Sequence, residues 1–458
     1  MKQRFFLIIN ALLLLFSTNS WGILHLVLTR GVDSAIPIAI VPFANEQIMP
    51  VKMGDAPLST RVSNVIATDL QNSGRLKVML GSDTEHMPHQ PADVKINYWR
   101  KQNVNYMVVG SVKRVDDSRY SVKFSLLDVY KHNQLGANPT LGNQALVLMS
   151  QVLTVSETQL RALAHHISDL IYQKIIGQHG IFSTRIAYVL LQRPVNKPPV
   201  YKLIIADYDG FNPQAILISH QPIMSPAWSP NGQKLAYVSF ESGQAAIYIS
   251  DITTGKRRLI TRFSGINGAP AFSPDGDKLA VVLSKGRNPN IYIINLLTKQ
   301  MRQITRGLAI NTEPAWASNG DSLLFTSDRG GAPQIYQVNL LTNKIKRLTF
   351  NGNYNAHASF SENDKTIVLL HRGEDTDGKF GVALFDLDSG VMQVLADDND
   401  QSPSLAPNGS MVIYAKQSKG RGELAMVSTD GRVSLQLPAE QGDVREPVWS
   451  PFLANGTA

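Results

Sequence analysis

The latter part of the chain alternates short apolar runs with turn-forming residues. From about Ile181 onward, strand patterns of six to eight residues are separated by Gly, Pro, Asn and Asp. One pattern returns along this region. "PAWSPNGQKLAYVSF" begins at Pro226, "PAFSPDGDKLAVVLS" at Pro270 and "PAWASNGDSLLFTSD" at Pro314. Each copy predicts a β-hairpin that opens on an inner strand.

These hairpins belong to a repeat with a measurable period. The first position of each hairpin, called the anchor here, recurs at intervals of 44, 44, 44, 45 and 44 residues. A repeat of four strands in ~40–45 residues is typical of one blade of a β-propeller. Six anchors therefore predict six blades. The anchors are Pro226, Pro270, Pro314, Ala358, Pro403 and Pro447.

The two ends of this region, residues 181–458, indicate how the ring closes. The last anchor, Pro447, opens an inner strand with no further strands after it. Three strand patterns at the start of the region match the missing second, third and fourth strands. They lie at Arg185–Gln192, Val200–Gly210 and Gln214–Ser219. We expect the C-terminal strand to complete this blade, because closure removes the exposed edges of the sheets.

The preceding part, residues 23–177, mixes strand and helix patterns. Ile36–Phe43 is a buried-strand run, and Ser59–Gly74 has helical spacing that opens on a capping residue and ends at a glycine. Ser156 and Gln159 form a capping box that opens a long helix. The chain is therefore expected to have two domains, an N-terminal α/β domain followed by a six-bladed β-propeller.

Some columns of the repeat are constant, whereas others change from blade to blade. Trp228, Trp316 and Trp449 occupy the same position of the repeat, two residues after the anchor, and the other blades have apolar residues there. This predicts an apolar slot between blades. The residues just before each anchor vary, from "QPIMS" and "SGING" to "AINTE", "NYNAH", "NDQS" and "DVRE". Loops that feed the inner strands surround the channel mouth, and binding residues concentrate on loops held by a rigid scaffold. The binding site is therefore expected on this ring of loops.

The N-terminus carries an export signal. Lys2 and Arg4 precede an apolar run, Phe5–Ser17, which is shorter than the ~20 residues of a membrane-spanning helix. Small residues at the −3 and −1 positions favour cleavage after Gly22. This pattern predicts a secretory signal peptide over residues 1–22 and a soluble, exported mature chain.

Composition and motifs narrow the chemistry. The 458 residues include no cysteine, which excludes disulfides, thiol catalysis and Cys-bound metals. The net charge is +8, but the positive residues are scattered, so no nucleic-acid partner is expected. No catalytic or nucleotide-binding motif is present. No catalytic residue, metal or cofactor is therefore predicted.

Isolated histidines and acidic stretches do not change this picture. His86 and His89 form a lone pair, and His165 has no partner evident in the sequence. Two acidic stretches, Glu374–Gly378 and Ala396–Asp400, lack the spacing of a full calcium loop. We interpret both stretches as solvated turns.

Several strings resemble the landmarks of one family. They include "GVDS" at Gly31–Ser34, "DLQNSGRL" at Asp69–Leu76, "TRIAYV" at Thr184–Val189 and "YDGFNPQ" at Tyr208–Gln214. On these strings the chain resembles the TolB family, the periplasmic propeller proteins of the Tol–Pal envelope system of Gram-negative bacteria. The resemblance covers essentially the whole mature chain.

The resemblance implies a non-enzymatic periplasmic adaptor without a cofactor. Family members bind the lipoprotein Pal through the propeller and TolA through the mature N-terminal segment. They support outer-membrane integrity and invagination during cell division. Other envelope proteins and Tol-dependent colicins are further implied partners. Association with membranes is implied through partners only.

The resemblance also implies which residues carry each contact. On the channel mouth, the residues that match the family's Pal surface are Met224, Ser225, Asn267, Gly268, Asn311, Thr312 and Glu313. The residues of the implied TolA segment are Ile23, Leu24, His25, Leu26, Val27, Leu28, Gly31, Val32, Asp33 and Ser34. The chain departs from the family at Ile266, where related sequences often carry His. Ile23–Arg30 also lacks the acidic residue common in the family.

An exported propeller enzyme, peptidase-associated or glycan-acting, is the alternative reading. A carboxylate at the channel mouth such as Glu313 has the chemistry of a general acid or base, and propellers host enzymes as well as binding proteins. Peptidase relatives, however, carry a separate hydrolase domain with a nucleophile elbow, and this chain has none.

Overall fold

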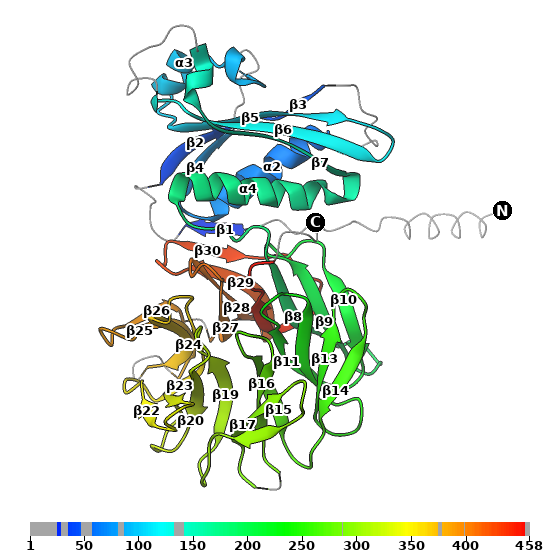
Figure 1. The fold of residues 1–458 in the computed structure, drawn as a ribbon, viewed down its shortest axis with the longest axis vertical. Coiled ribbons are helices and arrows are strands. Elements are labelled where there is room, and N and C mark those ends of the chain that lie inside the picture. Colours follow the sequence, from blue (N-terminus) through cyan, green and yellow to red (C-terminus); the bar gives the residue numbers. More distant parts are fainter. Residues whose placement is uncertain are drawn as a thin grey trace, which may run out of the picture.

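The computed structural model describes residues 25–28, 35–46, 57–80, 87–131, 142–285, 287–373, 378–397 and 399–453. The predicted signal peptide, residues 1–22, lies outside these ranges. So do several residues of the implied TolA segment, namely Ile23, Leu24, Gly31, Val32, Asp33 and Ser34. The described chain forms an α/β domain stacked against one side of a ring of sheets (Figure 1).

The N-terminal domain is built on one mixed β-sheet. Its strands are β2 (Ile36–Ile40), β3 (Ala44–Asn45), β4 (Leu76–Leu80), β5 (Tyr106–Arg114), β6 (Arg119–Asp128) and β7 (Val147–Ser156). The order across the sheet is β4-β2-β5-β6-β7, and β3 pairs with β5. β2 is parallel to β4 and β5, whereas β6 is antiparallel to both of its neighbours.

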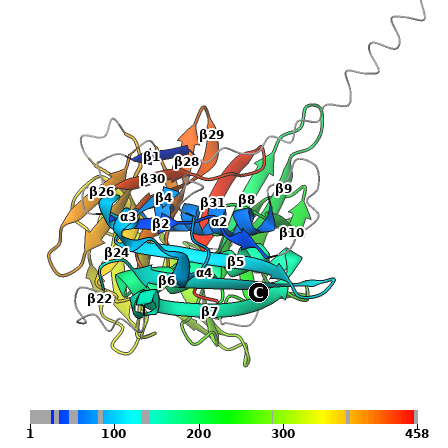
Figure 2. The same ribbon diagram turned by 90° about the horizontal axis from the view of Figure 1, so that it is seen from above.

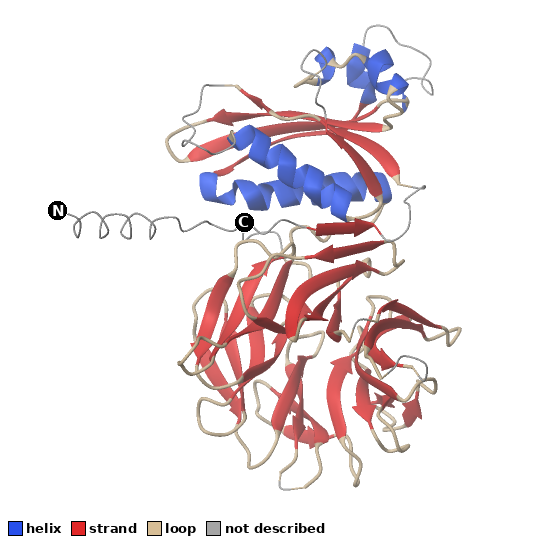
Figure 3. Ribbon diagram, turned by 180° about the vertical axis from the view of Figure 1, so that it is seen from behind, coloured by secondary structure: helices blue, strands red, loops and turns tan. Residues whose placement is uncertain are grey.

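Two helices, α2 (Leu58–Asn72) and α4 (Leu160–Ile176), lie between this sheet and the propeller (Figure 3). Alternation along β2 gives the sheet two buried faces. Ile38 and Ile40 belong to the cluster that contains residues of both helices, whereas Ala39 belongs to a second cluster. That second cluster contains Trp99 of the short helix α3 (Ile96–Lys101). The described part of the domain also contains three 3₁₀ turns, η2 (Pro91–Asp93), η4 (Gly142–Leu146) and η5 (Glu157–Gln159).

The two predicted helix starts have different outcomes. The capping box is confirmed, because Ser156 and Gln159 bond reciprocally at η5, directly before α4. The predicted capping residue of the first helix is wrong. α2 begins at Leu58, its N-cap is Pro57, and no side chain caps it.

The propeller consists of six sheets, which are arranged in a ring (Figure 1). Five of them, blades 1 to 5, follow one another along the chain. Blade 1 contains β11 (Ile223–Trp228), β12 (Lys234–Ser239), β13 (Ala246–Asp251) and β14 (Arg257–Thr261); blade 2 contains β15 (Asn267–Phe272), β16 (Lys278–Leu283), β17 (Asn290–Asn295) and β18 (Met301–Gln303); blade 3 contains β19 (Asn311–Trp316), β20 (Ser322–Ser327), β21 (Gln334–Asn339) and β22 (Ile345–Arg347). Blade 4 contains β23 (Tyr354–Phe360), β24 (Thr366–Arg372), β25 (Gly381–Asp386) and β26 (Met392–Ala396); blade 5 contains β27 (Gln401–Leu405), β28 (Met411–Ser418), β29 (Arg421–Ser428) and β30 (Val433–Gln436).

Blade 6 joins the two ends of the propeller region. It contains β8 (Arg185–Gln192), β9 (Val200–Asp207), β10 (Gln214–Ser219) and β31 (Asp443–Trp449). β31 pairs antiparallel with β8, with Val448 opposite Ala187 and Trp449 opposite Ile186. The inner strand of this blade therefore comes from the far end of the chain.

A segment before the α/β domain adds a fifth strand to blade 5. The backbone of β1 (His25–Leu28) pairs antiparallel with β30, with His25 opposite Gln436 and Leu28 opposite Val433. This pairing covers the outer edge of the blade, which would otherwise present unpaired N–H and C=O groups.

The tryptophan column packs between neighbouring blades, as predicted. Trp228 of blade 1 belongs to the same apolar cluster as Ala187 and Val448 of blade 6. Its indole N–H donates to the carbonyl of Val448, and that of Trp316 donates to the carbonyl of Ala271 in blade 2. A buried indole needs such a partner for its N–H. The tryptophans therefore fill the space between neighbouring blades and also link those blades by hydrogen bonds.

The two domains share one core. A single apolar cluster contains Leu70 of α2, Ile167 of α4, Tyr208 after β9 and Met426 of β29. Seen from above, the N-terminal domain overlaps one part of the ring (Figure 2). Within the described residues, no helix combines the length and the apolarity that crossing a bilayer requires.

Candidate functional site

Six inner strands line the channel of the propeller, β11, β15, β19, β23, β27 and β31. The channel holds a cavity of about 670 Å³. Within each blade the strands are antiparallel. The ends at which the inner strands begin therefore gather at one mouth, together with the loops between second and third strands. The first and third hairpin turns of blades 1 to 5, and the turn between β9 and β10 in blade 6, lie at the opposite end.

A bulge recurs at the start of every inner strand. The residue before each anchor has positive φ, although none of the six is glycine: Ser225, Ala269, Glu313, His357, Ser402 and Glu446, with φ from 43° to 53°. At each of these places the pairing register shifts, as between Met224 and Ala227 in blade 1. Bulges redirect side chains and cluster beside functional sites, and left-handed non-glycine residues are strained.

This bulge corrects one sequence expectation. The anchors do not open the inner strands, because those strands begin at least two residues earlier, at Ile223 in blade 1 and Tyr354 in blade 4. Although the earlier residues of most variable strings, such as Ile266 and Ile310, lie on the connections between blades, the residues directly before the anchors are strand residues within bulges, and not loop residues. A rigid strand holds them in place more firmly than a loop would.

Three of the six bulge residues are ionisable and lie close together. The Glu313 carboxylate accepts hydrogen bonds from the Thr326 hydroxyl at 2.7 Å and from the His357 backbone N–H at 2.8 Å. The His357 imidazole lies 3.6 Å from the same carboxylate. In blade 6, the Glu446 carboxylate accepts a hydrogen bond from the backbone N–H of Ser225. Each acid thus links its own bulge to that of the next blade around the ring.

Burial and these contacts shift the pKa values in the channel. Burial opposes ionisation of Glu313, but the hydrogen bonds and charge of His357, with the Thr326 bond, outweigh it and lower its pKa. Burial alone would lower the pKa of His357, and the bond and charge of Glu313 with the charge of Glu446 raise it. Burial raises the pKa of Glu446. The contact between the two side chains therefore favours the ionised form of Glu313 and the protonated form of His357.

The structure brings five of the seven predicted Pal-contact residues together on the channel. Met224, Ser225, Gly268, Thr312 and Glu313 all line it. Met224 is 42% exposed, so its side chain is accessible to a partner.

The other two predicted contacts are corrected, because both side chains are buried. Asn267 is 1% exposed and its amide bonds the carbonyl of Phe263 at 2.7 Å. Asn311 is fully buried and accepts hydrogen bonds from Ser327 and Arg329. These asparagine side chains stabilise the loops of the mouth through buried hydrogen bonds, and they are not accessible to a partner.

Two residues of the mouth are not among those predicted from the sequence. His357 and Glu446 line the channel beside Glu313. The signal for both was present in the sequence, since each occupies the position directly before an anchor, as Glu313 does. Extending the same column around all six blades would have found them.

A second polar group, the interdomain polar cluster, joins the two domains away from the channel. His165 of α4 bonds Asp69 of α2 through Nδ1 at 2.9 Å, and the Tyr208 hydroxyl donates to the other Asp69 oxygen at 2.7 Å. Arg161 of α4 pairs with Asp209 and lies 3.4 Å from Asp207. No local sequence pattern predicts this cluster, because its members are far apart along the chain.

Ligand atoms of Asp69, His165 and Asp209 lie within 4.8 Å of one another, which is the spacing of a metal site. Here, however, Arg161 occupies a carboxylate oxygen of Asp209, and Tyr208 and His165 occupy those of Asp69. A cation at this place would compete with Arg161 directly. The cluster is therefore an ion-pair network between the domains.

His165 is expected to make the stability of the chain depend on pH. Burial alone would lower its pKa, but the charge and hydrogen bond of Asp69, with the charge of Asp209, raise it. The stabilisation by protonated His165 is therefore complete below pH ~6.5, the unfolded value, and is lost as pH rises through the folded value. Removing one partner of a buried ion pair costs ~3–5 kcal/mol.

Melting temperatures of the wild type and His165→Gln should thus differ most at low pH, near pH 6, and converge toward pH 9. Exposed His89 provides the control, because His89→Gln should leave the melting temperature unchanged throughout. A wild-type-to-His165→Gln difference that stays constant across this range would contradict the account.

The remaining residues considered as ligands in the sequence are the isolated histidines and the two acidic stretches. His89 is exposed, whereas His86 lies outside the described residues. Residues 374–377 of the first acidic stretch and residue 398 of the second also lie outside them. In the second stretch the interpretation as a solvated turn is wrong at Asp400, which is fully buried and whose backbone N–H bonds the carbonyl of Phe380.

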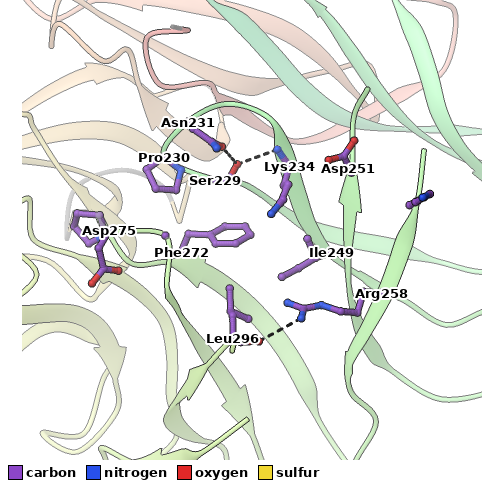
Figure 4. A pocket seen from close by; sticks show the side chains of 13 residues that line it. Ser229, Pro230, Asn231, Lys234, Ile249, Asp251, Arg258, Phe272, Asp275 and Leu296 are labelled. Carbon is purple, nitrogen blue, oxygen red and sulfur yellow. Dashed lines mark hydrogen bonds between the residues drawn. The ribbon is translucent and has the colours of Figure 1, made fainter. Parts of the chain in front are cut away.

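A separate pocket of about 560 Å³ lies between blades 1 and 2 at the end opposite the mouth (Figure 4). Its polar groups already serve the scaffold. The Arg258 guanidinium donates to the carbonyl of Leu296 in the next blade, and Ser229 and Asn231 bond each other within a hairpin turn. This pocket is a seam between repeats, so the channel mouth remains the candidate site.

Comparison with known proteins gives a consistent family. Residues 24–135 match the family described as the TolB amino-terminal domain, and residues 172–453 match the TolB beta propeller domain. A Coxiella burnetii protein named Tol-Pal system protein TolB is 55% identical over 96% of this chain and 97% of its own length. A Pseudomonas aeruginosa protein of the same name is 52% identical over 93% of this chain and 94% of its own.

A solved structure agrees with these relatives. The crystal structure of TolB from Acinetobacter baumannii superposes with a TM-score of 0.81 at 39% identity. The match covers 94% of this chain and all of that one.

Proposed function

The chain belongs to the TolB family, and from this premise we propose that it is a non-enzymatic adaptor of the Tol–Pal system. In this proposal the propeller mouth binds Pal and the mature N-terminal segment binds TolA. The work takes place in the periplasm, where the predicted signal peptide would deliver the chain. It supports outer-membrane integrity and invagination in cell division, and Tol-dependent colicins and other envelope proteins are further candidate ligands of the mouth.

One observation carries the Pal proposal. The part of the repeat that varies between blades converges on a single open mouth, where Met224, Gly268, Thr312 and Glu313 line one cavity. Repeat proteins keep the scaffold constant and vary the binding positions. The rigid bulges around the mouth also limit the conformational entropy that binding would cost.

The TolA proposal rests on the N-terminal segment. β1 is held by backbone pairing to the edge of β30. Recognition by an added strand uses main-chain hydrogen bonds, so the same backbone groups that pair with β30 could serve a partner after release. This is why His25–Leu28 is proposed as part of the TolA segment together with the residues around it.

The alternative, an exported propeller enzyme, is less well supported by the geometry of the acids. One Glu313 oxygen already accepts bonds from Thr326 and from the His357 backbone, and Glu446 accepts one from Ser225. These carboxylates tie blades together, whereas a general base needs a free oxygen directed at a substrate proton. Turnover of peptide or glycan substrates by the purified chain would favour the enzyme instead.

A double substitution at the mouth tests the Pal proposal. Thr312→Ala with Glu313→Gln removes a hydroxyl and a charge but keeps an oxygen that can accept the His357 N–H. Loss of a hot-spot contact of ~2 kcal/mol or more would weaken Pal binding by ~30-fold, and titration calorimetry would measure it.

The matched control is Thr298→Ala with Glu362→Gln, two exposed residues at hairpin turns on the opposite end. It should bind Pal like the wild type. If the mouth variant keeps both wild-type affinity and melting temperature, these two residues do not contribute to the Pal site.

A further inference from the structure

We propose that a basic and apolar crescent beside the channel mouth extends the partner site and binds an acidic surface of Pal. The crescent lies on blades 1 to 3 and rests on the proposed function, because it adds a recognition chemistry to the same mouth. Its cations are Arg262, Lys285, Arg287, Arg306 and Arg329, and its apolar residues are Phe263, Ile266, Leu308 and Ile310.

The topology places all nine residues on the mouth side. Arg262, Phe263 and Ile266 lie on the connection between β14 and β15, and Arg306 to Ile310 lie on the connection between β18 and β19. Both connections feed inner strands. Lys285, Arg287 and Arg329 lie on loops between second and third strands, which end at the same side.

These cations are exposed and not neutralised locally. Among the described residues, none of the five is within 4.0 Å of a carboxylate oxygen. The one acidic residue of these loops near them is Asp328, whose carboxylate accepts the backbone N–H of Ile310. A partner that carries carboxylates would therefore meet a positive electrostatic potential at these loops.

Aromatic rings hold two of the cations in place. The Lys285 ammonium lies 4.5 Å from the centre of the Phe263 ring, and the Arg329 guanidinium lies 5.1 Å from that of Tyr336. Arg329 also donates to the buried Asn311 at 2.6 Å. Since these side chains are already ordered, less conformational entropy is lost when a partner binds.

The apolar members are unusually exposed. Leu308 is 90% exposed, and Ile310 and Ile266 are 49% and 48% exposed. The loops that carry these residues contact one another, because the backbone N–H of Ile266 bonds Ser284 and the carbonyl of Leu308 accepts a bond from Asn288. Exposed apolar residues on neighbouring loops that also carry arginine are typical of protein interfaces. Ile266 also lines the channel beside Gly268, so the crescent is continuous with the mouth. This continuity favours the protein partner at the mouth over a separate lipid surface.

The test compares Pal binding by the wild type, Arg262→Gln with Arg306→Gln, and a control. The control is Lys256→Gln with Lys344→Gln, two exposed lysines at third hairpin turns on the opposite end. Rim charges act chiefly on the association rate and depend on salt. We expect the crescent variant to bind Pal about tenfold more weakly at about 50 mM salt and the difference to shrink at about 500 mM. The control should match the wild type.

The possible failures are distinguishable. If the wild type binds Pal and the crescent variant binds equally well at low salt, this inference is overturned while the proposed function stands. No Pal binding by the folded wild type would overturn both. Vesicles of phosphatidylglycerol and phosphatidylethanolamine form the last arm. Vesicle binding by the wild type that the crescent variant loses, with Pal affinity unchanged, would assign the crescent to lipid.

Discussion

Gly268→Trp is expected to weaken Pal binding by more than about a hundredfold, the loss of a central hot spot, while leaving the fold intact. Gly268 lines the channel mouth, and its φ is not in the left-handed region. A Cβ at this position would meet its nearest neighbour, the Ile266 side chain, at 3.8 Å, which is ordinary van der Waals contact. A side chain at this position therefore meets no clash at its Cβ in the free chain. A bulky indole there would block a partner from reaching the channel mouth.

Leu297→Trp is the matched control for this prediction. Leu297 is 89% exposed on the turn between β17 and β18, at the end away from the mouth. Both variants should melt close to the wild type, and only Gly268→Trp should lose Pal binding in a calorimetric titration. Undiminished binding by a folded Gly268→Trp chain would place the Pal site elsewhere.

Deleting residues 23–34 is expected to abolish TolA binding and to leave Pal binding unchanged. The deletion removes β1 and the rest of the proposed TolA segment, whereas the channel mouth lies on other strands. The core should survive, because β1 contributes an outer edge pairing to blade 5 and not an inner strand. Pull-down with purified TolA and with Pal measures the two activities separately.

A Gly/Ser segment of the same length in place of residues 23–34 controls for chain length. It should behave like the deletion, since a flexible polar segment offers neither the side chains nor the strand preference of the native one. Retained TolA binding by either variant would refute the assignment of TolA to this segment.

The fold was largely accessible from the sequence because the propeller repeats itself. Six anchors at a period of 44 to 45 residues predict six blades, and the unmatched strand at Pro447 points to three unmatched strands near Arg185. What periodicity does not reveal is where each inner strand starts. The bulge depends on left-handed backbone at residues such as Ser225 and His357, and side-chain types other than glycine give no signal for that conformation.

The site was accessible in part for the same reason. The variable strings before the anchors predict a binding site at the mouth, and the family resemblance implies Asn267 and Asn311 as part of the Pal surface. Neither source separates exposed side chains from buried ones such as these two. The interdomain polar cluster is harder still. Asp69 meets residues 96 and 139 positions away, His165 and Tyr208, and no local pattern encodes contacts that exist only after two domains pack.

The most direct test of the central claim is a calorimetric titration of Pal into the purified mature chain. The account predicts saturable binding of one Pal per chain that is lost in Gly268→Trp and retained in Leu297→Trp. No binding between two folded proteins, or equal binding by all three chains, would contradict the assignment of the channel mouth as the Pal site.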